Sequence, residues 1–174
     1  MMIISSLFRD WKRYEIKNCE YEPPCAHRVG ADWELVRPCV YKWEWDLGKY
    51  GFCHLQGYRW NGSTVPYLGQ ALCNITTLFE CSLPHDLGYE TQGGVRPFKI
   101  WQSNGTYVES ELVNWFTNEP LSARPLSRAR IDALMFAFAL ASRVPPGMDE
   151  EAYVGVYIGG QQAWNCEVPV IRSS

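Results

Sequence analysis

Hydrophobic and polar positions alternate in the first third of the chain. Residues 41–46 place aromatic and charged side chains strictly in turn, which puts three aromatic rings on one face of a strand. Residues 46–51 can turn the chain, and residues 52–60 predict a return strand. This aromatic face has two readings, a sugar-binding platform or part of the core. We expect the core, because large aromatics supply much of the burial in small domains.

A helical pattern follows the predicted strands. Residues 68–80 predict a short helix. Ser82 is then the expected N-cap of a separate helix, with Pro84 in its first turn, where the missing N–H costs nothing. Gly93 and Gly94 supply the C-terminal stop of that helix.

Two further elements have strong local signals. The segments 98–101 and 106–108 flank an Asn-Gly turn and predict a hairpin. Ser127 is the expected N-cap of a second helix that runs to about Arg143. Its apolar positions recur at helical spacing, and they are Ile131, Leu134, Met135 and Phe138.

The rest of the chain predicts one more helix and an extended end. Acidic residues at 149–151 begin this last helix, and glycines at 159–160 end it. We expect a single domain over 1–174, because this length suits one continuous core. Its expected parts are an N-terminal arm and β region at 1–40, a core at 50–160 with a hairpin insertion at about 95–125, and an extended tail at 161–174.

Composition narrows the class of protein. Apolar residues make up 47% and charged residues 20% of the 174 positions, and the net charge is -3. A nucleic-acid partner would require a basic stripe to displace counterions, so we expect none. No run of apolar residues is long enough to cross a bilayer. The apolar start, Met1 to Phe8, lacks a preceding basic stretch, so we expect no signal peptide and seven free cysteines.

The candidate chemistry lies on the two central helices. His85 and Tyr89 share a helical face, and Asp86 points about 100° away around the helix. Asp132 could meet His85 if the two helices pack antiparallel. A carboxylate on one imidazole nitrogen fixes the tautomer and leaves the other nitrogen free to accept a proton.

Other interpretations of these residues remain open. Asp86 could hold a hard cation such as calcium. The His-Asp pair could also be structural, since ion pairs of that kind are common. Asp132 could simply pair with Arg128 one turn earlier. His27 and His54 have no partners in the sequence and are interpreted as structural or exposed.

Three motifs resemble one known family. They are the loop at 60–66, the segment Pro84-His85-Asp86-Leu87-Gly88-Tyr89, and the segment at 127–134, followed by a tyrosine-containing helix that ends in glycine. Together they resemble the bacterial and tailed-phage family called domain of unknown function thirteen fifty-three. The resemblance covers roughly residues 50–160 and implies a protein of bacterial or tailed-phage origin.

The same motifs are also similar to secreted phospholipase A2, especially its prokaryotic branch. This resemblance implies that His85 is the general base for a water and that Asp132 orients it, with Tyr89 in the same catalytic set. It implies that calcium is held by Asp86 together with the loop residues Asn61 and Gly62. Calcium would then polarise an ester carbonyl as a Lewis acid.

Asn61 departs from both family patterns, which have an acid at this position. A neutral amide oxygen is a weaker ligand for a hard cation than a carboxylate. We therefore expect weak calcium binding or none, no other cofactor, and a weakened or inactive hydrolase. The expected fold is α+β, with N-terminal β-hairpins packed on a phospholipase A2-like pair of antiparallel helices plus a C-terminal helix.

Three functions are compatible with the sequence. The first is a virion component of the tail, baseplate or neck, made in the bacterial cytoplasm, with other virion proteins or further copies of itself as partners. The second is a calcium-dependent lipid or ester hydrolase. The third is a phage protein that binds a host target. A virion role would use the apolar N-terminal stretch and the tail for contacts with other chains.

Overall fold

The computed structural model describes residues 15–45, 48–61, 75–142 and 164. This part of the chain is mixed α+β, which confirms the predicted fold class in its coarse form. The predicted helix at 149–160 and almost all of the predicted tail lie outside the described residues. The elements are β1 (Lys17–Tyr21), β2 (Ala26–Val29), β3 (Asp32–Leu35), β4 (Cys39–Trp45), β5 (Gly48–His54), β6 (Arg59–Trp60), α3 (Ile75–Glu90), β7 (Phe98–Trp101), β8 (Tyr107–Ser110), a 3-10 turn (Leu121–Ala123) and α4 (Arg128–Ala141).

The described strands form three small antiparallel sheets, with the strand orders β1-β4-β5, β2-β3-β6 and β7-β8. In the first sheet β4 pairs with β5 from Cys39 opposite His54 to Trp45 opposite Gly48. The predicted return strand at 52–60 is therefore wrong in its bounds. The chain leaves β5 at His54 because it turns at Gly57, which has a φ of +83° and donates its N–H to Leu35.

Helix α3 differs from the prediction at its start. Pro84 lies inside the helix and not in its first turn, so the predicted N-cap at Ser82 is wrong. Residues 75–80 belong to this same helix and do not form a separate one. The helix continues through the proline with support from the sheet, because Tyr41 donates its hydroxyl to the carbonyl of Glu80 at 2.6 Å. That carbonyl is the one that the missing N–H of Pro84 leaves without its usual donor.

The ends of the helix pair follow their predicted signals. Gly93 has a φ of +71°, and its N–H bonds back to the carbonyl of Gly88 at 2.7 Å, which confirms the predicted stop of α3. Ser127 caps α4 through the N–H of Arg130, as predicted. Helix α4 ends at Ala141, slightly before the predicted end. Neither described helix is long and apolar enough to cross a membrane.

The two helices pack antiparallel and very closely. Gly88 of α3 lies against Ile131 of α4, and Gly93 farther along the chain lies against Leu126, which precedes α4. The contacts therefore run in opposite directions along the two segments. A methyl group on Gly88 would lie only 2.6 Å from Cδ1 of Ile131. The absence of a side chain at Gly88 sets the distance between the helices at the level of His85.

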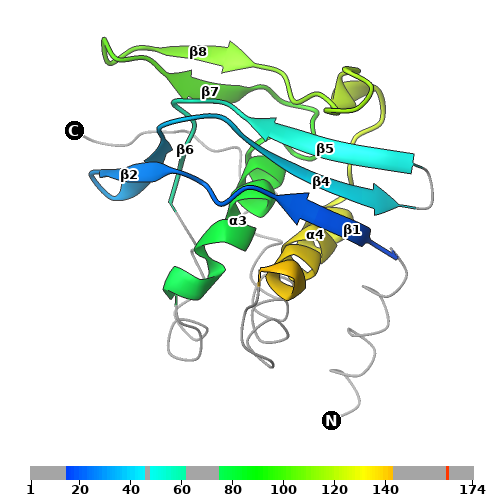
Figure 1. The fold of residues 1–174 in the computed structure, drawn as a ribbon. Coiled ribbons are helices and arrows are strands. Elements are labelled where there is room, and N and C mark those ends of the chain that lie inside the picture. The colour runs from blue at the N-terminus through cyan, green and yellow to red at the C-terminus, as the bar shows by residue number, and fades with distance from the viewer. Residues whose placement is uncertain (1–14, 46–47, 62–74, 143–163, 165–174) are drawn as a thin grey trace.

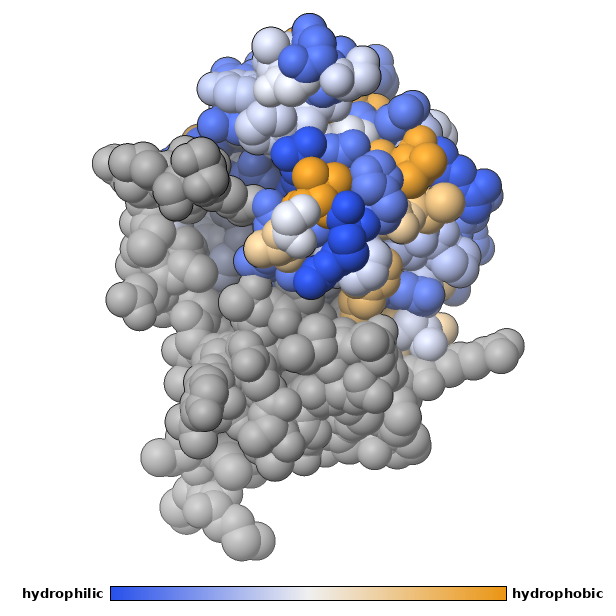
Figure 2. Space-filling model, turned by 90° about the vertical axis from the view of Figure 1, so that its left-hand side faces the viewer, coloured by the Kyte–Doolittle hydropathy of each residue, from blue (hydrophilic) through white to orange (hydrophobic). Residues whose placement is uncertain are grey.

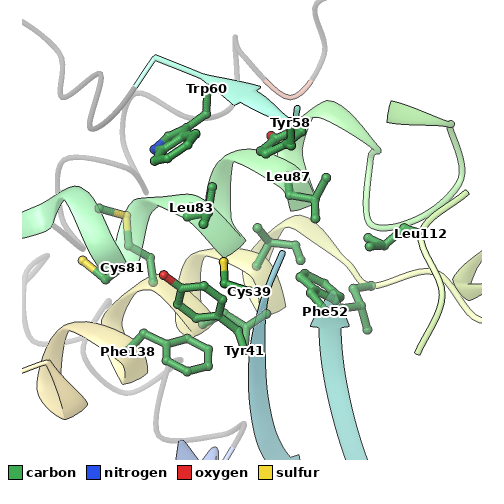
Figure 3. Packing of buried hydrophobic residues seen from close by; sticks show 14 of the residues in the cluster. Cys39, Tyr41, Phe52, Tyr58, Trp60, Cys81, Leu83, Leu87, Leu112 and Phe138 are labelled. Carbon is green, nitrogen blue, oxygen red and sulfur yellow. The ribbon is translucent and has the colours of Figure 1, made fainter. Parts of the chain in front are cut away.

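The aromatic face of β4 forms the centre of the core. The sheet β1-β4-β5 lies across the helix pair (Figure 1), and Figure 3 shows Tyr41 beside Phe138 of α4. Their ring centroids are 5.0 Å apart in an edge-to-face arrangement. Trp43 and Phe52 are also buried in this cluster. The core interpretation of the alternating aromatics is confirmed.

Candidate functional site

The structure brings His85 and Asp132 together across the two helices. His85 lies on α3 with 7% of its surface exposed, and Asp132 on α4 is fully buried. Nε2 of His85 is 3.4 Å from Oδ1 of Asp132, although the two groups are not aligned for a hydrogen bond. The predicted proximity of these side chains is confirmed, and it follows from the close approach at Gly88.

Tyr89 and Arg128 complete the surroundings of the buried carboxylate. The hydroxyl of Tyr89 donates to Oδ1 of Asp132 at 2.6 Å. The ring of Tyr89 also lies over the imidazole of His85, with 4.2 Å between centroids. On the other side, Nε of Arg128 is 3.8 Å from Oδ2 of Asp132. Asp132 therefore contacts Arg128 on its own helix as well as His85 and Tyr89 on α3, and it faces three polar groups.

Asp86 does not point away from His85 as expected. Its Oδ1 lies 3.3 Å from Nδ1 of the neighbouring imidazole, and its side chain is 23% exposed. Both ring nitrogens of His85 thus face a carboxylate. The free nitrogen that the proton-transfer hypothesis requires is engaged in this arrangement, because the short Asp86 side chain bends back along its own helix.

These neighbours determine the charge of the imidazole. Burial by itself lowers the pKa of His85, but the carboxylates of Asp132 and Asp86 outweigh burial and raise this pKa to about 9. Burial raises the pKa of Asp86, and the interaction with His85 opposes that rise. Burial, together with the charge of Asp132, also raises the pKa of Tyr89. An imidazolium donates two protons and cannot accept one, so His85 is a poor base in this state.

The structure describes the residues assigned to calcium only in part. Asp86 faces His85, and Asn61 offers only a neutral oxygen at the end of a described segment. Gly62 lies outside the described residues. Within the described residues, no three His, Cys, Asp or Glu side chains gather closely enough to hold a metal ion. Calcium prefers six or more oxygen ligands, and the described residues include only Asp86 and Asn61 from the assigned set.

One neighbour of the site could not be anticipated from the sequence. The ring of Trp164 packs edge-on against Tyr89, with 5.2 Å between centroids. Its backbone carbonyl accepts a hydrogen bond from Nε2 of Gln92 at 2.9 Å. Trp164 follows no periodic pattern in the sequence, so nothing local connected it with α3.

His54 is a second buried histidine, and its surroundings differ from those of His85 because they are aromatic. It is fully buried, and the rings of Tyr41, Phe52 and Tyr58 surround it. Burial lowers the pKa of His54 to about 3, although nearby backbone groups oppose this slightly. The structural interpretation of His54 is confirmed, because a neutral imidazole enclosed by aromatic rings has no access to a substrate.

The site thus combines an Asp132–His85 contact with a second carboxylate that occupies the remaining nitrogen. The arrangement can join two helices tightly, and it could transfer a proton only after Asp86 moves. No protein-family model, no curated protein and no solved structure matches this chain. The resemblance to the phage family and to phospholipase A2 therefore stays a prediction that rests on the three motifs.

Proposed function

We propose that this chain is a structural component of a tailed-phage virion whose phospholipase A2-like helix pair serves assembly and not lipid hydrolysis. The observation that supports this most directly is the position of His85. Its two nitrogens face Asp132 at 3.4 Å and Asp86 at 3.3 Å, and the residue is only 7% exposed. Within the part of the chain that the structure describes, each ring nitrogen thus faces a carboxylate oxygen, which leaves neither free to take a proton from water.

The polar cluster has a structural use that requires no substrate. A buried charge that loses its partner is strongly destabilising, so paired groups at this depth favour one arrangement of the surrounding elements. His85 and Tyr89 from α3 both contact Asp132 from α4. These contacts hold α3 and α4 in one register next to the close approach at Gly88. A rigid core of this kind suits a protein that must present fixed surfaces to neighbours.

The surface also supports a role in assembly. Trp115 and Phe116 are 47% and 45% exposed, on a loop that hydrogen bonds hold in place. Asn114 donates its side-chain N–H to the carbonyl of Lys49 at 3.2 Å, and Trp115 donates its N–H to Gly51 at 2.9 Å. Large aromatics on an ordered loop are typical of protein–protein interfaces.

A hydrolase is the second candidate, and one observation favours it. Asp132, His85 and Tyr89 meet in the combination that the phospholipase resemblance implies. For activity, Asp86 would have to leave Nδ1 of His85, so that this nitrogen could take a proton from water while Asp132 stabilised the resulting imidazolium.

Two measurements test the proposal. Purified full-length protein is assayed on phospholipid vesicles and on a soluble ester, with and without added calcium. We expect no turnover above that of His85→Gln, with His27→Gln as the matched control because His27 is exposed and lies on β2, outside the helix pair. Turnover that His85→Gln abolishes and His27→Gln retains would overturn the proposal. Mass spectrometry of purified particles should find the chain in stoichiometric amount, and its absence there would also refute a virion role.

A further inference from the structure

The outer side of β8 is a free sheet edge, because no other strand in the described part of the chain pairs with it. Strand β8 pairs only with β7 within that part, and it lies at the outer margin of the molecule, away from the helices (Figure 1). Phe98 and Ile100 on β7 are 1% and 8% exposed, whereas Tyr107 and Val108 on β8 are 45% and 49% exposed. Val108 is paired with Ile100 and shares its face, so this apolar face is covered at β7 and open at Val108, whereas Tyr107 lies exposed on the opposite face.

The hairpin turn determines which backbone groups of β8 point outward. The N–H of Gln102 bonds to the carbonyl of Thr106 at 2.8 Å. In an antiparallel pair, successive residues direct their backbone groups alternately toward the partner and away from it. Val108 therefore directs its N–H and C=O toward β7, while Tyr107 and Glu109 direct theirs toward the open edge. This edge offers two donors and two acceptors to another strand.

We propose that β8 pairs antiparallel with β8 of a second copy of this chain, about a two-fold axis at Val108. This register places Tyr107 opposite Glu109 of the second copy and uses all the outward backbone groups of both residues. It also places Val108 against its own equivalent in a non-hydrogen-bonded pair, where Cα atoms are about 4.5 Å apart and side chains touch. The inference goes beyond the assembly role proposed above, because it is argued from the edge of β8 alone.

The charges on the hairpin favour a second copy as the occupant. Lys99 lies opposite Glu109 within its own chain, and its Nζ lies 4.4 Å from the centre of the Tyr107 ring. In the proposed register, Glu109 of the second copy comes beside Tyr107 and therefore beside Lys99. Opposite charges meet across the axis in both halves of the interface, and the two Glu109 side chains stay apart.

The size of the contact sets its expected strength. Two four-residue strands bury less than the roughly 1,000 Å² that a stable interface usually requires. The pair of chains should therefore associate weakly and in a concentration-dependent way, which suits a contact that forms at high local density in a particle.

The described part of the face shown in Figure 2 offers no comparable surface. Its hydrophobic residues lie in small groups among hydrophilic ones, and such scattered residues need no partner.

A cysteine placed on the axis gives the direct test. Val108→Cys and Val36→Cys are each made in full-length protein that also carries Cys25→Ser, because Cys25 is an exposed thiol. Val36 is the matched control, since it is 45% exposed and directly follows β3, which belongs to a different sheet. Under mild oxidation at high concentration, we expect Val108→Cys to give a disulfide-linked dimer as the main species. Val36→Cys should stay monomeric.

Sedimentation of the unmodified chain provides the second measurement. Its mean mass should rise with concentration, and Glu109→Pro should remove most of this rise. Proline at 109 deletes one outward N–H but no bond to β7, so circular dichroism should show the fold intact. A wild-type chain that stays monomeric up to its solubility limit would overturn the inference, as would equal crosslinking of the two cysteine variants.

These outcomes separate the interface from the proposed function. A monomeric chain that is nevertheless found in particles, with incorporation sensitive to Glu109→Pro, would assign the β8 edge to a strand of a different virion protein and overturn the pairing of two copies. Conversely, lipid turnover that depends on His85 in a chain that still crosslinks at position 108 would overturn the assembly-only role. The β8 interface would then stand by itself.

Discussion

The hydrogen bond from Tyr41 to the carbonyl of Glu80 offers the sharpest test of how the sheet supports the helix. Pro84 cannot donate to the carbonyl four residues earlier, and the Tyr41 hydroxyl takes that place at 2.6 Å. Tyr41 is fully buried, so water cannot replace the hydroxyl. Tyr41→Phe keeps the ring and its packing and removes only this donor.

The expected loss follows from the state of the carbonyl after the change. A buried acceptor without a partner costs about 1–3 kcal/mol, and the free energy of unfolding should fall by that amount. Pro84→Ala restores an N–H that can bond to Glu80 within the helix. In this background Tyr41→Phe leaves no unsatisfied carbonyl, so its cost should be smaller by about 1 kcal/mol.

Urea unfolding of the four proteins in this double-mutant cycle supplies the measurement. The slope of each transition should stay constant, so that midpoints report stability. We expect the stability changes of Tyr41→Phe and Pro84→Ala to be clearly non-additive. If Tyr41→Phe costs the same in both backgrounds, the hydroxyl does not compensate for the proline and the reasoning is wrong.

Three further predictions concern the helix pair and the buried His54. Gly88→Ala should lower the free energy of unfolding by about 1–3 kcal/mol through overpacking against Ile131, and Ile131→Val should reduce that loss in a urea-unfolding cycle. Tyr89→Phe should lower it by about 1.5–3 kcal/mol, because a buried charged acceptor loses a hydrogen bond; an unchanged midpoint would mean that another donor replaces the hydroxyl. His54 has a folded-state pKa of about 3, below its ordinary value of 6.5, so the unfolded chain binds the proton and stability is lost as the pH falls below 6.5. Between pH 7 and pH 5 the contribution of His54 falls by about 2 kcal/mol. Urea unfolding at both pH values should show the wild type losing this much stability relative to His54→Gln, because the opposing contribution of His85, whose pKa is raised to about 9, is common to both proteins.

Local signals in the sequence determined several parts of this protein. The alternation in β4 placed its aromatics on one buried face, because side chains in a strand point to opposite sides in turn. The Asn-Gly turn predicted the hairpin β7–β8, and Ser127 predicted the start of α4. The proximity of His85 and Asp132 also followed from the sequence, since the motifs that carry them resemble a known pair of helices.

Other features were decided only by tertiary contacts. Local rules placed Pro84 at a helix start because a proline inside a helix leaves a carbonyl unpaired, and a tyrosine from β4 supplies the missing donor. The return strand ended at His54 because Gly57 makes contacts with distant segments. The contact of Asp86 with His85 is favoured by the positive charge that Asp132, remote in sequence, stabilises on the imidazole. Each of these outcomes depends on a group remote in sequence, and local periodicity carries no information about such a group.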